Sequence, residues 1–431
     1  MTLRRSFAAA LLAAGALFIA ACGSSGGGGT TSSSGSGKVA PTFAAASAAK
    51  PKGTVTYCTG KDTSGAQKES LKLFNQQYKS QGLSARLLEF PTSADEQRNQ
   101  FIQREQAKSP ECDIFFSDVI WTAEFASQKW LMDMSNYIKA RTSEFIPSTL
   151  ETAHYQGKYW GVPQASDSAF LFYRTDKLPS PPTTWQQAYA DAKKYGGITY
   201  QGTAYEGLTC DYLELAYAAG GQVLSPDGKK SLINSPQNLA ALQFMVNGVK
   251  NGSASKAVTT YMEETARRAW EAGKAVEMRN WTYAYALGQM SKIKGKFKVA
   301  PLPSWQGGGK AGILGGHNLV VSAYSKNPNG AVVLTHFLTS PKVEALDAAK
   351  YSLAPVLNTT YDDPAVKKAL PYTPQLRLDI QQAKARPVSP VYPQISEAIY
   401  NNVNKALSGQ QSPQDALKNA NSQINKALQT F

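Results

Sequence analysis

The chain has 431 residues, of which 42% are hydrophobic and 18% charged, and its formal net charge is +14. This composition is typical of a globular protein and excludes a disordered or fibrous chain. The lysines are scattered and form no Arg-rich stripe. The positive charge therefore favours solubility, or contact with an anionic lipid or polymer, over nucleic-acid binding.

The first 22 residues carry the pattern of an export signal. Arg4 and Arg5 precede an apolar run over residues 7–20, which is shorter than the about 20 residues that a membrane-spanning helix needs. Small residues then lead to Cys22. This arrangement resembles a bacterial lipobox, in which the Cys is lipidated and becomes the first residue of the mature chain. We predict a lipoprotein signal peptide over 1–21 and a lipid anchor on Cys22; the alternative is an ordinary signal peptide with a chance Cys.

A low-complexity segment follows Cys22. Residues 23–37 are almost wholly Gly, Ser and Thr, which cannot bury a core and behave as a flexible coil. We predict a flexible tether over residues 22–51, with an r.m.s. span of roughly 30 Å. The roughly 380 residues that remain are enough for two lobes. We expect this folded body to lie outside the cytoplasm, held at the cell membrane by the lipid.

Three cysteines remain in the folded body, Cys58, Cys112 and Cys210. An odd number outside the cell leaves at least one unpaired. Cys58 falls at the end of a predicted strand and Cys112 at the start of another, so parallel pairing of these strands would hold the two thiols apart. We therefore expect three buried free thiols, which pack like small hydrophobic side chains.

Strands and helices alternate in the first part of the folded body. The spacing of apolar residues predicts a strand at 54–58, a helix through Leu71, Phe74 and Tyr78, a strand at 85–90, a helix at 94–107, a strand at 113–116, a hairpin at 155–163 that turns at Gly157, and a strand at 169–174. This order predicts an α/β fold, in which helices cover both faces of a parallel sheet.

Helices dominate the second half of the chain. The pattern predicts a helix from the N-cap Thr184 to Tyr195, a largely helical stretch over 209–290, short strands at 275–278, 297–300 and 319–323, a helix at 328–338, and two amphipathic helices over 395–407 and 417–428.

Motifs for catalysis or metal binding are missing from the sequence. The three histidines, His154, His317 and His336, have no second ligand at metal-binding spacing. Gly309 and Lys310 lack the rest of a phosphate-binding loop, and the folded body has no G-x-S-x-G. We expect no metal and no cofactor. Carboxylates occur throughout, so the sequence leaves open a pair of glycosidase acids.

Six segments carry a family resemblance. They are TYCTGKDTSG at 56–65, DIFFSDVIWTAEFASQKWL at 113–131, YWGVP with the following residues at 159–185, YEGLTC at 205–210, RNWTYAY at 279–285 and RPVSP at 386–390. In this order they resemble the bacterial extracellular solute-binding proteins (family 1) of ABC sugar importers, and within them the trehalose/maltose-binding branch. Each segment alone is weak, but six in order behind a lipobox are specific.

The resemblance implies a periplasmic-binding-protein-like fold of type II. In such a fold two α/β lobes enclose a ligand cleft, and the chain crosses between them more than once through a hinge that bends when the lobes close. It places residues 52–163 and 315–360 in lobe 1 and residues 166–313 and 361–431 in lobe 2, with crossings near residues 163–166, 314 and 358–363.

A sugar site needs flat aromatic side chains for the C–H faces of the ring and planar charged groups for its hydroxyls. Asp118 falls just after a predicted strand, where α/β clefts form, and Trp281 and Tyr283 are the expected stacking platforms. Arg386 is the position at which the branch presents an Arg to the sugar. The resemblance implies a ligand site made of Asp62, Thr63, Asp118, Trp121, Asp167, Glu206, Trp281, Tyr283, Gly316, His317 and Arg386.

One position departs from the branch. After Gly315 and Gly316 the branch often has an aromatic such as Trp, and this chain has His317. We expect the smaller ring to weaken stacking and to change which sugar fits. If His317 faces the cleft, we also expect ligand affinity to change between about pH 5 and 7.5.

The sequence therefore predicts a non-enzymatic, monomeric lipoprotein. It would capture a sugar, such as a disaccharide or short α-glucoside like trehalose or maltose, and deliver it to the membrane subunits of an ABC permease. A polyol or another oligosaccharide is an alternative ligand. An exported glycan-cleaving enzyme, with two carboxylates about 5–9.5 Å apart, and a wall-binding adhesion or sensory lipoprotein with salt-sensitive polymer binding are alternatives of other classes.

Overall fold

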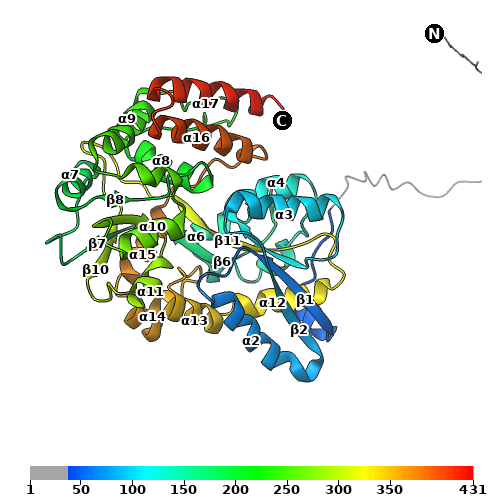
Figure 1. The fold of residues 1–431 in the computed structure, drawn as a ribbon. Coiled ribbons are helices and arrows are strands. Elements are labelled where there is room, and N and C mark those ends of the chain that lie inside the picture. The colour runs from blue at the N-terminus through cyan, green and yellow to red at the C-terminus, as the bar shows by residue number, and fades with distance from the viewer. Residues whose placement is uncertain (1–36, 431) are drawn as a thin grey trace, which may run out of the picture. The chain divides into compact units, whose positions relative to one another are not determined.

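A computed structural model describes residues 37–430 and builds them around two sheets (Figure 1). The first sheet has the strand order β2-β1-β3-β11-β6. Its strands are β1 (Gly53–Thr59), β2 (Leu83–Glu89), β3 (Ile114–Asp118), β6 (Val162–Ser168) and β11 (Leu314–Val321). As the alternation of strands and helices predicts, β1 is parallel to β2 and β3. The late strand β11 inserts antiparallel between β3 and β6.

Both faces of the first sheet are covered by helices, because its central strands are apolar on both sides. Successive side chains of a strand point to opposite faces. Tyr57, Phe116 and Leu319 pack in one core with α2 (Ala66–Tyr78) and α12 (Pro328–Leu338). Their neighbours Phe115 and Val320 pack in another core with α3 (Ala94–Gln106) and α4 (Thr122–Ser127). We call this sheet with its helices the first lobe.

The second sheet has the order β10-β7-β9-β8. It contains β7 (Phe170–Arg174), β8 (Ile198–Thr199), β9 (Glu277–Asn280) and β10 (Phe297–Pro301). The chain leaves the first sheet after Ser168 and enters the second at Phe170, so β6 and β7 connect the two sheets directly. Helices α7 (Trp185–Tyr195) and α10 (Glu263–Glu271) contact this sheet, and α11 (Ala284–Gln289) shares a core with Phe172 and Phe297 of its strands.

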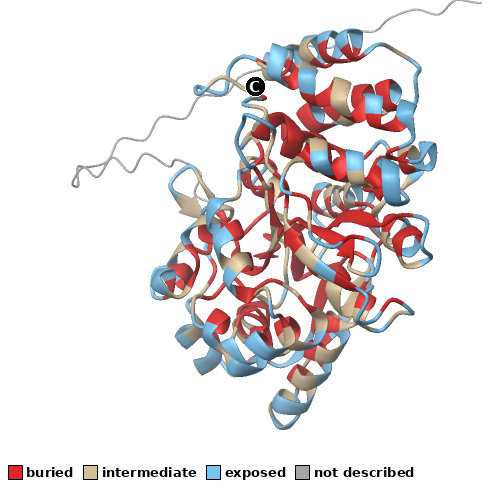
Figure 2. Cartoon of the chain, turned by 90° about the vertical axis from the view of Figure 1, so that its left-hand side faces the viewer, coloured by how far each residue is buried: buried red, intermediate tan, exposed pale blue. Residues whose placement is uncertain are grey.

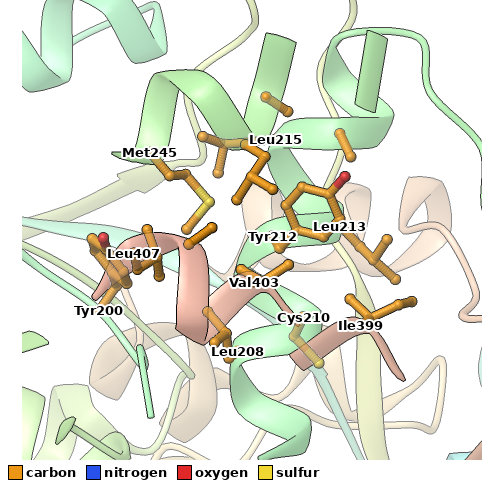
Figure 3. Close-up of a cluster of buried hydrophobic side chains, with 14 of the residues drawn as sticks. Tyr200, Leu208, Cys210, Tyr212, Leu213, Leu215, Met245, Ile399, Val403 and Leu407 are labelled. Atoms are coloured by element: carbon orange, nitrogen blue, oxygen red, sulfur yellow. The ribbon is translucent and has the colours of Figure 1, made fainter. Parts of the chain in front are cut away.

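The second lobe consists of the second sheet, the helices on it and four long helices. Helices α8 (Glu206–Ala218), α9 (Pro236–Asn251), α16 (Tyr392–Leu407) and α17 (Pro413–Leu428) pack against one another. Figure 3 shows Leu208, Tyr212 and Leu215 of α8 in one core with Ile399 and Val403 of α16. The two predicted C-terminal amphipathic helices are confirmed. Buried residues line the strands and the inner helix faces, and the outer helix faces are exposed (Figure 2).

Shorter elements connect these layers. They are α1 (Phe43–Ala48), η1 (Lys79–Gln81), η2 (Val119–Trp121), α5 (Ser135–Ile138), η3 (Thr142–Glu144), α6 (Pro147–Glu151), β4 (His154–Tyr155), β5 (Lys158–Tyr159), η4 (Lys256–Thr260), α13 (Pro341–Tyr351), η5 (Thr360–Asp362), α14 (Pro364–Ala369) and α15 (Thr373–Gln382). The hairpin β4–β5 turns at Gln156 and Gly157, as predicted, with φ of 49° and 76°. Two positive φ angles in a two-residue loop match the twist of the paired strands.

The predicted tether differs from the structure near its end. Cys22 and the first half of the tether, residues 22–36, lie outside the described residues. From Val39 onward, however, the chain is packed on the first lobe: Val39 bridges to Asp133, and the Phe43 ring stacks on His336 with centroids 3.6 Å apart. The apolar side chains of Phe43 and Ala46 give this segment surface to bury, so the prediction of a coil up to residue 51 is wrong.

The prediction of three free thiols is also wrong. Cys58 and Cys112 form a buried disulfide with Cα atoms 5.8 Å apart, and Cys210 is a buried free thiol. The strands β1 and β3 are parallel neighbours as expected, and Cys58 is in register with Phe115. Cys112, however, lies before β3 begins at Ile114 and so outside the ladder. The chain there bends toward Cys58 instead of continuing the strand.

No helix within residues 37–430 is both long enough and apolar enough to cross a membrane.

Candidate functional site

A cavity of about 250 Å³ is lined by residues from both lobes. It lies where β1, β3 and β9 end and where α8 and α10 begin, so strand ends and helix N-termini surround it. Of the eleven residues expected in the ligand site, the structure brings all but Trp121 to this cavity. They are Asp62, Thr63, Asp118, Asp167, Glu206, Trp281, Tyr283, Gly316, His317 and Arg386.

Trp121 is placed elsewhere, and its expected ligand contact is corrected. Its side chain is buried in the core beneath α3 and α4, against Phe101 and Phe125. Trp121 follows Asp118 by three residues, and the short helix η2 turns it away from the cavity and into the core. An aromatic residue at helical spacing packs here as a core residue.

Arg386 bridges the two lobes inside the cavity. Its Nη1 donates to Oε1 of Glu206 at 2.8 Å, and its Nη2 donates to Oδ1 of Asp118 at 3.3 Å and to the carbonyl of Leu314 at 3.3 Å. Asp118 ends β3 of the first lobe, and Glu206 begins α8 of the second. A guanidinium is planar and presents several donors, so one side chain satisfies both carboxylates.

The Glu206 carboxylate is buried and fixed by several hydrogen bonds, unlike an acidic side chain on an exposed loop. It is 4% exposed, and Oε1 accepts from the Tyr392 hydroxyl at 2.6 Å, while Ser396 donates to Oε2. Burial raises the pKa of Glu206 to about 7, although Arg386 opposes this shift. Its backbone N–H donates to Oδ2 of Asp95 in the first lobe at 3.1 Å. Glu206 therefore holds Arg386 in place and links the lobes through its own backbone.

Trp281 presents an aromatic surface to the cavity. It follows β9, and the guanidinium of Arg279 lies 4.0 Å from the centre of its ring. Arg279 is itself fixed by Asp211 at 2.9 Å and Glu214 at 2.8 Å. A Cβ at Gly315 would come within 3.2 Å of the indole. The absent side chain at Gly315 thus leaves room for Trp281 beside β11.

Tyr283 and Asp167 lie beside Trp281. The Tyr283 hydroxyl donates to Glu264 at 2.9 Å. Oδ1 of Asp167 accepts from the backbone N–H and the hydroxyl of Thr282, both at 3.1 Å. Burial raises the pKa of Asp167 to about 7. Thr282 thereby connects β6 of the first sheet to the segment that carries both aromatic residues.

Asp62 caps a helix while it lines the cavity. Its carboxylate accepts from the backbone N–H groups of Gly65 at 2.8 Å and Lys68 at 3.0 Å, and from the Ser64 hydroxyl at 3.2 Å. These N–H groups begin α2, and a helix N-terminus stabilises a negative charge. Thr63 lines the cavity next to it.

His317 faces the cavity and stacks on Phe116, with ring centroids 3.9 Å apart and planes at 7°. Burial lowers the pKa of His317 to about 4, and Arg386 adds to this effect while Asp118 opposes it. The ring is therefore expected to be neutral from pH 5 to 7.5, so His317 itself gives no reason for the predicted change of affinity in that range, which stays a prediction. Gly316 before it has φ of 113°, and a Cβ there would lie 2.3 Å from the Ala165 carbonyl, so this approach of β11 to β6 requires glycine.

Three acidic residues near the cavity were missed in the sequence. Glu263 and Glu264 begin α10 and line the cavity, and Asp95 lies in the first turn of α3. Acidic residues in the first turn of a helix are common because the helix dipole favours them. That position gave no signal by which to distinguish them from ordinary surface acids.

Two α/β lobes that share a polar cavity with an aromatic wall define the class of two-lobed solute-binding proteins. The chain belongs to the bacterial extracellular solute-binding protein family, whose model matches residues 88–345. The family resemblance and the two-lobed fold predicted from the sequence are both confirmed.

Relatives support the same assignment. A Deinococcus radiodurans protein described as a probable ABC transporter-binding protein is 36% identical over 369 aligned residues, and the match covers 80% of this chain and 87% of the relative. The solved structure of maltose-bound T. maritima MalE3 is 35% identical with a TM-score of 0.83, and the match covers 86% of this chain and 99% of that one. A Thermotoga lettingae ABC transporter solute-binding protein bound with α-D-tagatose is 27% identical with a TM-score of 0.80, and the match covers 87% and 99%.

Proteins of this family bind solutes for ABC transporters and are not enzymes. The prediction of a non-enzymatic protein is therefore confirmed, and the glycan-cleaving alternative is excluded. An extracellular family also fits the predicted place outside the cytoplasm.

Proposed function

We propose that the protein captures a disaccharide or short α-glucoside, such as trehalose or maltose, in the cavity between its lobes and delivers it to an ABC permease. The observation that carries the proposal is the pairing of the Trp281 ring with the Arg386–Asp118–Glu206 group in one cavity. A sugar ring has apolar C–H faces that pack on an aromatic plane. Its hydroxyls both donate and accept, which suits a planar cation flanked by carboxylates.

The relative with bound maltose favours an α-glucoside, since it is 35% identical to this chain. The relative with bound tagatose is 27% identical, so a monosaccharide remains an outcome of the test. Ten of the predicted residues would contact or shape the ligand; Trp121 is left out because it is buried in the core.

Closure of the lobes around the sugar would create the form that the permease recognises. We propose residues 39–168 with 314–360 as the first lobe, which keeps β6 and β11 whole, and residues 169–313 with 361–431 as the second. The hydrogen bond from the Glu206 backbone to Asp95 joins the lobes at one edge of the cavity. Rigid lobes that move about a few connecting residues are the usual basis of such closure.

The protein would work as a monomer attached to the membrane by a lipid on Cys22. Cys22→Ser should release it into the medium, and continued membrane association of this variant would refute the anchor. Binding a soluble sugar with a stoichiometry of 1:1, insensitive to salt, would separate this function from that of a polymer-binding adhesion or sensory lipoprotein.

A thermal-shift screen of ligand-free protein against sugars and polyols tests the proposal. A ligand at 100 times its dissociation constant stabilises the folded state by about 2.7 kcal/mol. We expect trehalose or maltose to raise the melting temperature. A shift with polyols alone would replace the α-glucoside with a polyol as ligand, and a panel without any shift would overturn the proposal.

A further inference from the structure

The cavity is strongly acidic. Six carboxylates and two cationic side chains line it, namely Asp62, Asp118, Asp167, Glu206, Glu263 and Glu264 against Lys61 and Arg386. His317 adds no positive charge near neutral pH, because burial lowers its pKa to about 4. Lys61 is mostly exposed, with its ammonium 3.8 Å from Glu89, which lies outside the cavity lining.

Four of these carboxylates are compensated by neighbouring groups. Asp118 and Glu206 share Arg386. Asp62 accepts backbone N–H groups at the start of α2. Glu264 pairs with Arg267 at 2.7 Å. Their negative charge is neutralised or stabilised within the protein, so these carboxylates do not need a positive group on the ligand.

In the described part of the chain, Asp167 and Glu263 lack the cation that pairs with Asp118, Glu206 and Glu264. Within residues 37–430, neither carboxylate lies within ion-pair distance of a cation. Arg279 is near both, but Asp211 and Glu214 already pair with it. Burial raises the pKa of both carboxyl groups despite Arg279, which shows that their surroundings disfavour the negative charge.

Both carboxylates belong to the Trp281 end of the cavity. Asp167 accepts from Thr282, which follows Trp281 in the chain, and a Cβ on Gly315 would contact both the indole and the Asp167 Cβ. Glu263 is held there through its carbonyl, which accepts from Asn280 Nδ2 at 3.1 Å. The aromatic surface on which a ring would lie is thus bordered by two carboxylates that lack a cation.

We propose that Asp167 and Glu263 make the Trp281 end of the cavity a charge filter, which favours a sugar carrying a protonated amine, accepts a neutral sugar, and rejects a sugar carrying a carboxylate or phosphate. This inference rests on the proposed function and narrows its ligand class. A like charge brought into a partly buried site is repelled much more strongly than in water, because the effective dielectric is lower.

The test compares three ligands of one shape at about pH 8, which lies above the pKa of about 7 of Asp167. The probes are the better-bound of trehalose and maltose, its 6,6′-diamino derivative and its 6,6′-dicarboxylate. Substituting both ends removes any dependence on the direction of binding. We expect the diamine to bind at least as tightly as the neutral sugar, and the dicarboxylate to bind about tenfold more weakly or worse.

Glu263→Gln separates charge from shape, because it removes the charge and keeps the volume. We expect the variant to regain about tenfold in affinity for the dicarboxylate relative to the neutral sugar. The matched control is Glu271→Gln, which makes the same change on α10 outside the cavity lining and should leave the ranking unchanged. Equal affinities for the neutral sugar and the dicarboxylate would overturn the charge filter alone. The same holds if the dicarboxylate binds weakly and Glu263→Gln does not improve its binding. Failure of all three probes to bind would overturn the proposed function and this inference with it.

Discussion

The two ends of the cavity use their charges in opposite ways. At one end, Arg386 compensates Asp118 and Glu206 and joins the lobes, so its polar groups are largely paired before any ligand arrives. At the other end, Trp281 lies beside Asp167 and Glu263, and neither carboxylate has a cation within ion-pair distance among the described residues. The first end is therefore expected to maintain the integrity of the site and to bind sugar hydroxyls. The second is expected to contribute the aromatic surface and the selectivity for ligand charge.

The largest expected effect falls at the paired end. Arg386→Met leaves Asp118 and Glu206 without their cation, and loss of one partner of a buried ion pair destabilises by about 3–5 kcal/mol. We expect urea denaturation to show this loss, with ligand affinity falling as well. Arg377→Met is the control, because Arg377 is more exposed, lies 3.8 Å from the surface residue Asp362 and should lose less than about 1 kcal/mol. A stable Arg386→Met protein would contradict the role given to this end.

A second prediction separates the electrostatics of the fold from those of the cavity. Glu277 is fully buried outside the cavity lining, its carboxylate oxygens have no hydrogen-bond partner among the described residues, and burial raises its pKa from 4.5 to about 9. The folded state keeps this proton where the unfolded chain releases it, so its contribution to stability falls as pH rises from 4.5 to 9. Between pH 4.5 and 7 the free energy of unfolding of the wild type should fall by about 3 kcal/mol relative to that of the Glu277→Gln variant.

Denaturation at a series of pH values measures this difference, and ligand affinity at pH 7 is the accompanying readout. An unchanged affinity is expected, because Glu277 does not line the cavity. A stability difference that stays constant across pH would show that Glu277 does not hold a proton in the folded protein.

At the aromatic end we expect an effect on binding rather than on stability. Trp281→Ala removes the ring surface and should weaken sugar binding by about 30-fold, or ~2 kcal/mol. Trp305→Ala is a control with the same substitution, since Trp305 is outside the cavity lining. Calorimetric titration measures the sugar affinity of both variants. Equal affinities would show that Trp281 does not contact the sugar.

The smallest expected effect is that of pH through His317. Because burial lowers its pKa to about 4, the ring stays neutral from pH 5 to 7.5. Replacing His317 by Gln should therefore leave the shape of the affinity–pH profile in that range unaltered. A midpoint near pH 6.5 that disappears in His317→Gln would show that the ring is charged in the physiological range.

The sequence predicted much of the site by two routes. The end of an apolar strand marked Asp118, and the family resemblance implied Arg386 in RPVSP; both line the cavity. The errors arose where three-dimensional packing decides. Trp121 lies three residues from Asp118 yet turns into the core, and Cys112 reaches Cys58 only because the chain bends before β3. Glu263 looked like any acid that begins a helix.

The structure of the protein with a bound sugar tests the central claim most directly. The account predicts trehalose or maltose in the cavity between the lobes, with one ring packed on Trp281 and hydroxyls bonded to Arg386 and Asp118. A sugar bound at another surface, or bound in the cavity without contact to Trp281 and Arg386, would contradict it.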